Sequence, residues 1–157
     1  MKKILFICTG NTCRSPMAEA LFKKMIRDNP DWMRDVSVSS AGIYAYENDP
    51  ASSLAREVMR EEYALDLSKH RARLLMDEDI RQAYLVLTMT EHHREMVLDI
   101  YPEGGDKVYT LKDFAEMDDG EPDIADPFGG DYKAYQDCAA EIESVLMSVI
   151  DKLFDKM

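Results

Sequence analysis

The first thirty residues combine a short apolar run with a helical pattern. Residues 3–7, within "KKILFICTG", have the pattern of a buried strand that ends at a glycine turn. Beyond the turn, apolar side chains recur at helical spacing as far as about Asn29, namely Met17, Ala20, Leu21 and Met25. We expect Ser15 to be the N-cap of this helix and Pro16 its first residue, since proline suits that position. The chain therefore opens with a strand, a tight loop and a helix.

Strand and helix patterns alternate along the rest of the chain. Strands are expected at residues 35–43, 83–90 and 106–111, and helices at 52–63, 91–100 and 132–154. The strand at 83–90 is apolar enough to be buried on both faces. This alternation predicts an α/β fold, in which crossovers join parallel strands and helices cover both faces of the sheet. Ligands bind such sheets beyond the carboxyl ends of the strands, which is where the first strand delivers Cys8.

Composition limits the classes of protein to which the chain can belong. Its 157 residues suffice for one hydrophobic core, so we expect a single domain over residues 1–157. The net charge of −12 argues against nucleic-acid binding, which needs clustered lysine and arginine. No apolar run approaches the roughly 20 residues that span a bilayer, so we expect no membrane partner and a cytoplasmic protein. Three cysteines form no disulfide framework, which fits a reducing compartment and chemistry by free thiols.

The stretch "CTGNTCRSP", residues 8–16, gathers groups suited to phosphate chemistry. Backbone N–H groups of a glycine-containing loop and of a first helical turn lack intrahelical acceptors and converge on an anion. The Arg14 guanidinium adds planar donors that match two phosphate oxygens. The helix N-terminus and the guanidinium both favour a thiolate at Cys8, and the Ser15 hydroxyl can donate to its sulfur. We therefore expect Cys8 to attack phosphorus and form a phosphocysteine.

These residues resemble the signature of the low-molecular-weight protein tyrosine phosphatase family. The similarity continues in "SSAGI", "DLSKHRARLL" and "DPFGGD", and so runs nearly end to end. It implies a four-stranded parallel sheet flanked by helices, the Rossmann-like three-layer fold of phosphotyrosine protein phosphatase I. It also implies hydrolysis of phosphorylated proteins through Cys8, with no metal or other cofactor. Phosphate or another oxyanion would be bound by Arg14 and by Thr9, Gly10, Asn11, Thr12, Cys13 and Ser15.

Asp126 of "ADPFGGD" is the candidate proton donor that the leaving group requires. Pro127 stiffens the segment, two glycines let it turn, and the resemblance places this aspartate over the phosphate site. Residue chemistry alone gives it only a modest lead over the aspartates nearby, which are Asp113, Asp118, Asp119, Asp123 and Asp131.

Several further residues are candidates for supporting roles. Asn11 suits a left-handed loop conformation and a hydrogen bond that fixes Ser15. His70 matches a histidine that supports the loop in the family. His92 and His93 are adjacent on a predicted helix and lack the pattern of a zinc site, so we expect both at the surface.

The other two cysteines leave more than one interpretation open. Cys13 could pair with Cys8 under oxidation and protect it from irreversible oxidation, or it could be a small packing residue. Cys138 lies on the apolar stripe of the last predicted helix and is expected in the core.

Thr12 decides the predicted substrate. Tyrosine-directed members of the family typically carry an aliphatic residue at this position, whereas a hydroxyl can meet the polar guanidinium of phosphoarginine. With threonine here, the stretch resembles the bacterial protein-arginine phosphatase branch. Phe128 could form an apolar wall, and Asp126 could pair with guanidinium N–H groups as well as protonate the departing nitrogen. We therefore predict a protein-arginine phosphatase.

Three alternatives stay open at this point. A protein-tyrosine phosphatase comes next, because Tyr44 and Tyr46 could form an aromatic wall for a phenyl ring. An arsenate reductase would need a further pair of cysteines, and Cys138 alone does not supply it. A non-catalytic phosphate-binding module would not need a nucleophile, an arginine and an acid together.

Overall fold

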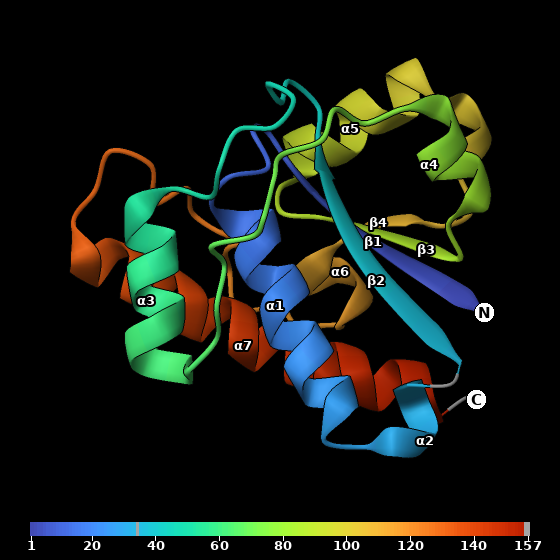
Figure 1. Ribbon diagram of the computed structural model, residues 1–157. Coiled ribbons are helices and arrows are strands. Elements are labelled where there is room, and N and C mark those ends of the chain that lie inside the picture. The colour runs from blue at the N-terminus through green and yellow to red at the C-terminus, as the bar shows by residue number, and fades with distance from the viewer. Residues whose placement is uncertain (34, 156–157) are drawn as a thin grey trace.

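Four parallel strands form the centre of the computed structural model, which describes residues 1–33 and 35–155 (Figure 1). The strands are β1 Lys2–Cys8, β2 Val36–Gly42, β3 Leu85–Thr88 and β4 Val108–Thr110. Their order is β2-β1-β3-β4, and each pair of neighbours is parallel. Every strand overlaps a segment predicted as one. The α/β class and the four-stranded parallel sheet are therefore confirmed.

The helices follow the predicted alternation, with short additions. They are α1 Arg14–Arg27, α2 Pro30–Met33, α3 Ser53–Tyr63, α4 Asp77–Gln82, α5 Glu91–Ile100, α6 Leu111–Phe114 and α7 Tyr132–Asp155, with a 3₁₀ helix η1 at Pro102–Gly104. The longer helices α1, α3, α5 and α7 are the four predicted ones. The others have three to six residues, which is too short for helical periodicity to reveal them.

The start of α1 differs from the prediction. The helix begins at Arg14 with Cys13 as its N-cap, so placing the cap at Ser15 was wrong by two residues. The Ser15 hydroxyl lies within hydrogen-bond distance of the Cys8 sulfur and accepts from the Asn11 amide instead of capping the backbone. Pro16 still falls in the first turn, where a backbone N–H has no intrahelical acceptor to lose.

Side chains of β1 alternate between two cores, one on each face of the sheet. Ile4 and Phe6 pack with residues of α1, α3, α6 and α7, whereas Leu5 and Ile7 pack with residues of α4 and α5. Figure 1 shows the same division, with α4 and α5 on one side of the strands and α1, α6 and α7 on the other. This is the predicted three-layer arrangement. No helix among the described residues combines the length and apolarity needed to cross a membrane.

The carboxyl ends of β1 and β2 meet where the loop of residues 9–13, here called the first loop, leaves the sheet. Cys8 is paired with Gly42 in the register of the two strands. A Cβ atom at Gly42 would lie 2.6 Å from the Thr9 carbonyl oxygen and 2.9 Å from the Asn11 nitrogen. Only glycine allows the first loop to pass so close to β2.

Candidate active site

Carbonyl groups of Cys8 and of the first loop are hydrogen-bonded to the segments that surround the loop. The carbonyls of Cys8 and Thr9 accept hydrogen bonds from the backbone of Ile43 and Tyr44, at 3.1 and 2.9 Å. The carbonyl of Thr12 accepts from the Ser52 N–H at 2.9 Å. In a trans peptide the N–H points opposite to the C=O, so the N–H groups of the following residues face the other side. The loop therefore presents a concave row of donors suited to an oxyanion.

His70 fixes one more of these carbonyls. Its Nε2 atom lies 2.7 Å from the Asn11 carbonyl oxygen. Because a carbonyl can only accept, Nε2 carries the proton and donates. The half-buried ring thus orients the peptide between Asn11 and Thr12, and the predicted contact between His70 and the loop is present.

The Cys8 sulfur lies 2.9 Å from the Ser15 oxygen. That oxygen also accepts a hydrogen bond from Nδ2 of Asn11 at 2.9 Å. Since the Asn11 amide can only donate there, the Ser15 hydroxyl keeps its hydrogen for the sulfur. A hydroxyl that donates to sulfur stabilises the thiolate relative to the thiol.

Both polar atoms of the Asn11 side chain form hydrogen bonds. Its φ of 58° is the left-handed conformation expected from the sequence. Besides Ser15, Nδ2 donates to the Ser40 oxygen at 2.9 Å, and Oδ1 accepts from the Arg73 N–H at 3.0 Å. The Ser40 hydroxyl in turn donates to Glu19 at 2.6 Å. This network joins the first loop to β2, to α1 and to the segment after His70, so the loop is fixed from several sides.

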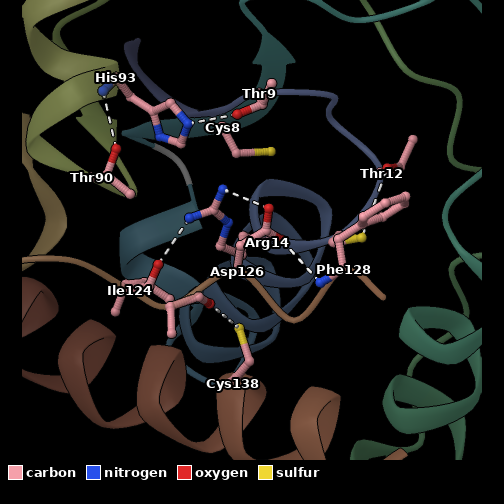
Figure 2. Close-up of polar contacts among 12 residues, drawn as sticks. Cys8, Thr9, Thr12, Arg14, Thr90, His93, Ile124, Asp126, Phe128 and Cys138 are labelled. Carbon is pink, nitrogen blue, oxygen red and sulfur yellow. Dashed lines mark hydrogen bonds and ion pairs between the residues drawn. The ribbon is translucent and has the colours of Figure 1, made fainter. Parts of the chain in front are cut away.

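Arg14 lies under the first loop and is 5% exposed. Nη1 donates to the carbonyl of Ile124 at 2.9 Å, and Nη2 lies 3.5 Å from Oδ2 of Asp126 (Figure 2). The guanidinium therefore connects the start of α1 with the loop of residues 125–131, here called the Asp126 loop. Ile124 is itself anchored to the end of β3, because its N–H donates to the Met89 carbonyl at 2.9 Å.

The Asp126 loop brings a carboxylate to the site from a segment more than 100 residues along the chain from Arg14. Oδ1 of Asp126 accepts from the Phe128 N–H at 3.1 Å, and Gly129 has a φ of 82°. Both features hold the loop in a tight turn, and a side chain at Gly129 would be strained. Asp126 is 52% exposed, so its second oxygen is accessible from solvent as well as to Arg14.

The other five candidate aspartates form no ion pair with Arg14 in the described residues. Asp123 accepts from the Glu91 N–H at 2.8 Å, Asp131 accepts from the Ala134 N–H at 3.0 Å, and Asp119 pairs with Lys112 at 3.2 Å. Asp113 and Asp118 line a separate hollow beside α6. Of the six, Asp126 alone forms an ion pair with Arg14 in the described residues.

A cavity of about 520 Å³ opens above Cys8. Its floor comes from Cys8, Arg14 and the first loop, and its walls come from Tyr44, Tyr46, Asp49, Asp126 and Phe128. Thr12 and Phe128 both line it, as predicted, and Phe128 is 77% exposed. A hollow of about 590 Å³ beside α3 offers no thiol or imidazole.

His93 is not a surface residue, so that prediction was wrong. It is 4% exposed, and its Nε2 atom lies 2.8 Å from Oγ1 of Thr9 (Figure 2). Burial, and next the positive charge of Arg14, lower the pKa of His93 from 6.5 to about 4. The pair of histidines at the start of α5 is divided by the turn of the helix, so that His92 is exposed while His93 points inward.

Cys13 and Cys138 are buried free thiols. The Cys13 sulfur lies 3.3 Å from the Tyr135 hydroxyl and donates to Ser52 at 3.5 Å, so it links the first loop to α7 and α3. Cys138 is in the core as predicted and donates to the Ala125 carbonyl at 3.6 Å. Burial raises the pKa of Cys138 to about 12, which keeps it a thiol.

Three features of the site had no signal in the sequence. Tyr135 lies within the predicted helix 132–154 and Asp49 between two predicted elements, with no local pattern that indicates chemistry, and His93 was expected only as half of an exposed pair. Each comes from a segment far along the chain from the first loop. A pattern read along one sequence does not contain such contacts. No group of three or more metal-ligating side chains occurs in the part of the chain that the structure describes.

Comparison with known proteins agrees with the geometry. A model described as "Low molecular weight phosphotyrosine protein phosphatase" matches residues 3–157. The chain belongs to this family. Members are cysteine-dependent protein phosphatases, so the predicted family and enzyme class are confirmed.

Relatives within the family are named for two different substrates, phosphoarginine and phosphotyrosine. A protein-arginine-phosphatase of Geobacillus stearothermophilus is 42% identical over 151 residues, which cover 96% of this chain and 95% of that protein. The structure of a low molecular weight protein tyrosine phosphatase from T. tengcongensis is 41% identical and has a TM-score of 0.85, with 100% of both chains covered. A mutant of the YwlE arginine phosphatase with a phosphorylated active-site serine is 37% identical and has a TM-score of 0.88, with 96% of this chain and 95% of that chain covered.

Proposed function

We propose that this phosphatase hydrolyses phosphoarginine residues in proteins through a phosphocysteine on Cys8. The observation that carries the proposal is the lining of the cavity, where the hydroxyl of Thr12 and the carboxylate of Asp126 lie above Cys8 and Arg14. Phosphoarginine needs both an oxyanion site for its phosphoryl group and polar acceptors for its guanidinium N–H groups. The relative named as a protein-arginine-phosphatase supports the same substrate.

In the first step the Cys8 thiolate attacks phosphorus. The S–P bond forms and the P–N bond breaks, while the departing guanidine nitrogen takes a proton from Asp126. Arg14 and the inward-facing N–H groups of the first loop stabilise the negative charge on the phosphoryl oxygens. The products of this step are phosphocysteine and an unmodified arginine side chain. The relative with a phosphorylated active-site serine supports phosphoryl transfer to this position of the loop.

In the second step water attacks the phosphocysteine. Asp126, now a carboxylate, accepts a proton from the water, and the S–P bond breaks to release inorganic phosphate. The hydroxyl of Ser15 donates to the returning thiolate, which makes the sulfur a better leaving group. Cys8, Asp126 and Ser15 thereby return to their starting protonation states.

Guanidinium recognition is assigned to the walls of the cavity. One carboxyl oxygen of Asp126 accepts from an N–H of the guanidinium while the other oxygen carries the proton for the departing nitrogen. Thr12 accepts a further N–H, and Phe128 packs against the aliphatic stem. Phosphotyrosine is the second candidate substrate, because Tyr44 and Tyr46 line the same cavity and are exposed enough to contact a phenyl ring. The T. tengcongensis relative supports that alternative by name.

An arsenate reductase is disfavoured by the third cysteine. A relay of disulfides needs a thiol that forms a thiolate and reaches the surface, whereas Cys138 is buried and stays protonated. We further infer that residues 1–157 work as one phosphatase domain and that the protein acts in the cytoplasm, where free thiols such as its three cysteines persist.

The proposal is tested by quenching the reaction of a phosphoarginine peptide in mild acid and locating phosphate by mass spectrometry. We expect phosphate on Cys8 in the wild type and no phosphate release by Cys8→Ser. Cys138→Ser, which changes a buried thiol outside the cavity, is the matched control and should still release phosphate. Release by Cys8→Ser at the wild-type rate would contradict the mechanism.

A further inference from the structure

We propose that His93 is a positioning residue that turns the hydroxyl of Thr9 into a hydrogen-bond donor for the phosphoryl group. In this arrangement Nε2–H of His93 donates to Oγ1 of Thr9, and the Thr9 hydroxyl donates into the cavity. The inference rests on the proposed oxyanion-binding role of the first loop. It does not depend on which phosphorylated residue is the substrate.

Thr9 follows β1 and His93 lies in the helix that follows the neighbouring strand β3, so the two side chains meet at the carboxyl edge of the sheet. Thr9 follows Cys8 directly and lines the cavity with it. His93 lies in the first turn of α5, where its N–H donates to Oγ1 of Thr90 at 3.0 Å. The distance from Nε2 to Oγ1 of Thr9 is 2.8 Å, and Figure 2 shows the His93 ring directed at Thr9. The ring is therefore fixed by its helix and by burial.

The other nitrogen of the ring decides the direction of this hydrogen bond. Nδ1 of His93 is buried and has no hydrogen-bond partner among the described residues. A proton on Nδ1 would leave a buried N–H without an acceptor, and such orphaned donors are the rarest unsatisfied groups in folded proteins. A proton on Nε2 leaves only a lone pair at Nδ1. The second tautomer costs less free energy, so Nε2 is the donor to Thr9.

The charges around the ring agree with a neutral imidazole that carries one proton. Arg14 from α1 and His92 from α5 lower the pKa of His93, while Asp123 and Asp126 raise it by less than burial lowers it. The ring is therefore neutral at neutral pH.

Thr9 then has its own hydrogen to offer. A hydroxyl that accepts one hydrogen bond can rotate its hydrogen toward another acceptor, and phosphoryl oxygens only accept. The same logic applies on the other side of Cys8, where Asn11 donates to Ser15 and leaves that hydroxyl free to donate to the sulfur. Two hydroxyl groups beside Cys8 are thus oriented by buried side chains, one toward sulfur and the other toward phosphate.

A double-mutant cycle tests the proposal, with the inhibition constant of inorganic phosphate against p-nitrophenyl phosphate as the readout. Thr9→Val removes the hydroxyl and should raise this constant about tenfold, as expected for a hydrogen bond to a charged group. His93→Leu should raise it by a similar factor. The double variant should be no weaker than Thr9→Val alone, because His93 acts through Thr9. Multiplication of the two effects to about a hundredfold would overturn the proposal.

Three further measurements separate positioning from a merely structural role. His93→Gln retains a side-chain amide donor and should recover most of the phosphate affinity, whereas His92→Leu, on the same turn, should change nothing. Nitrogen NMR of the labelled wild-type protein should find the His93 proton on Nε2, and a proton on Nδ1 would contradict the inference even if the Leu variant fails to fold. If the wild type cleaved no phosphorylated substrate, the proposed function would fail, while phosphate titration by NMR would still decide the role of Thr9 and His93.

Discussion

The hydroxyl oxygen of Ser15 lies 2.9 Å from the sulfur of Cys8 and accepts a hydrogen bond from Asn11 at the same distance. One side chain therefore sets the direction of the hydrogen bond that reaches the proposed nucleophile. Because Asn11 donates to the Ser15 oxygen, the hydrogen of the Ser15 hydroxyl is directed at the Cys8 sulfur.

Ser15→Ala should lower kcat. The change removes a donor to a charged sulfur, a contribution of about 1.5–3 kcal/mol, so we expect a loss of about ten- to a hundredfold. Steady-state hydrolysis of p-nitrophenyl phosphate measures it. Ser39→Ala, at an exposed position of β2, is the matched control and should retain full activity. An equal loss in both variants would show that the effect is not specific to the Cys8 contact.

Asp126→Asn should affect substrates according to their leaving groups. We expect kcat/KM for a phosphoarginine peptide, which reports the step that releases the leaving group, to fall by about 10²–10⁴, the usual contribution of general acid catalysis. The loss for p-nitrophenyl phosphate should be smaller, since nitrophenolate leaves without a proton. Asp131→Asn retains the contact with the Ala134 N–H and should leave both rates unchanged. Identical losses of Asp126→Asn on both substrates would argue against its role as the acid.

Stability should fall in acid partly because of His93. Its pKa is lowered from 6.5 to about 4 in the folded protein. Between these pH values His93 is therefore protonated in the unfolded chain but stays neutral in the folded protein. The contribution of His93 to the free energy of unfolding is complete above pH 6.5 and is lost toward pH 4, at up to about 1.4 kcal/mol per pH unit.

Urea unfolding of the wild type and of two glutamine variants measures this contribution. In His93→Gln the free energy of unfolding should fall less steeply between pH 6.5 and 4 than in the wild type. His92→Gln, in which an exposed side chain is replaced, should keep the wild-type dependence on pH. An unchanged slope in His93→Gln would mean that this histidine is not the group that resists protonation.

Thr12→Ile should move the substrate preference. An aliphatic side chain at the cavity mouth removes a polar acceptor for guanidinium and adds apolar surface for a phenyl ring. We expect the ratio of kcat/KM for phosphoarginine over phosphotyrosine peptides to fall at least about tenfold. Thr12→Ser keeps the hydroxyl and should keep the ratio close to that of the wild type. An unchanged ratio in Thr12→Ile would show that Thr12 does not set the substrate preference.

The fold was largely predictable because its longer elements carry their own periodicity. β3 shows a continuous apolar run and α7 an apolar stripe of about five turns from Tyr135 to Leu153, so neither depends on distant residues for recognition. The local geometry at Asn11 was also predictable, since a left-handed residue in a tight loop favours asparagine. Short elements such as α4 and α6 escaped because one turn of helix contains too few positions to show a period.

Site residues that lie within one loop were predictable from the sequence, whereas contacts between segments far apart in the chain were not. Cys8, Arg14 and Ser15 lie within one loop, so their spacing indicates their chemistry directly. His93 was misjudged because its partner, Thr9, is 84 residues away, and only the packing of α5 against the end of β1 brings the two together. Asp126 was singled out from its neighbours by the family resemblance, and the ion pair with Arg14 gives a physical reason for that choice.

The substrate assignment is tested by the ratio of kcat/KM for one peptide carrying phosphoarginine to that for a matched peptide carrying phosphotyrosine. Phosphoserine in the same position serves as the third substrate. We expect the wild type to cleave phosphoarginine most efficiently and Cys8→Ser to cleave none of the three. A wild-type preference for phosphotyrosine would contradict the substrate assignment, and activity in Cys8→Ser would contradict the mechanism.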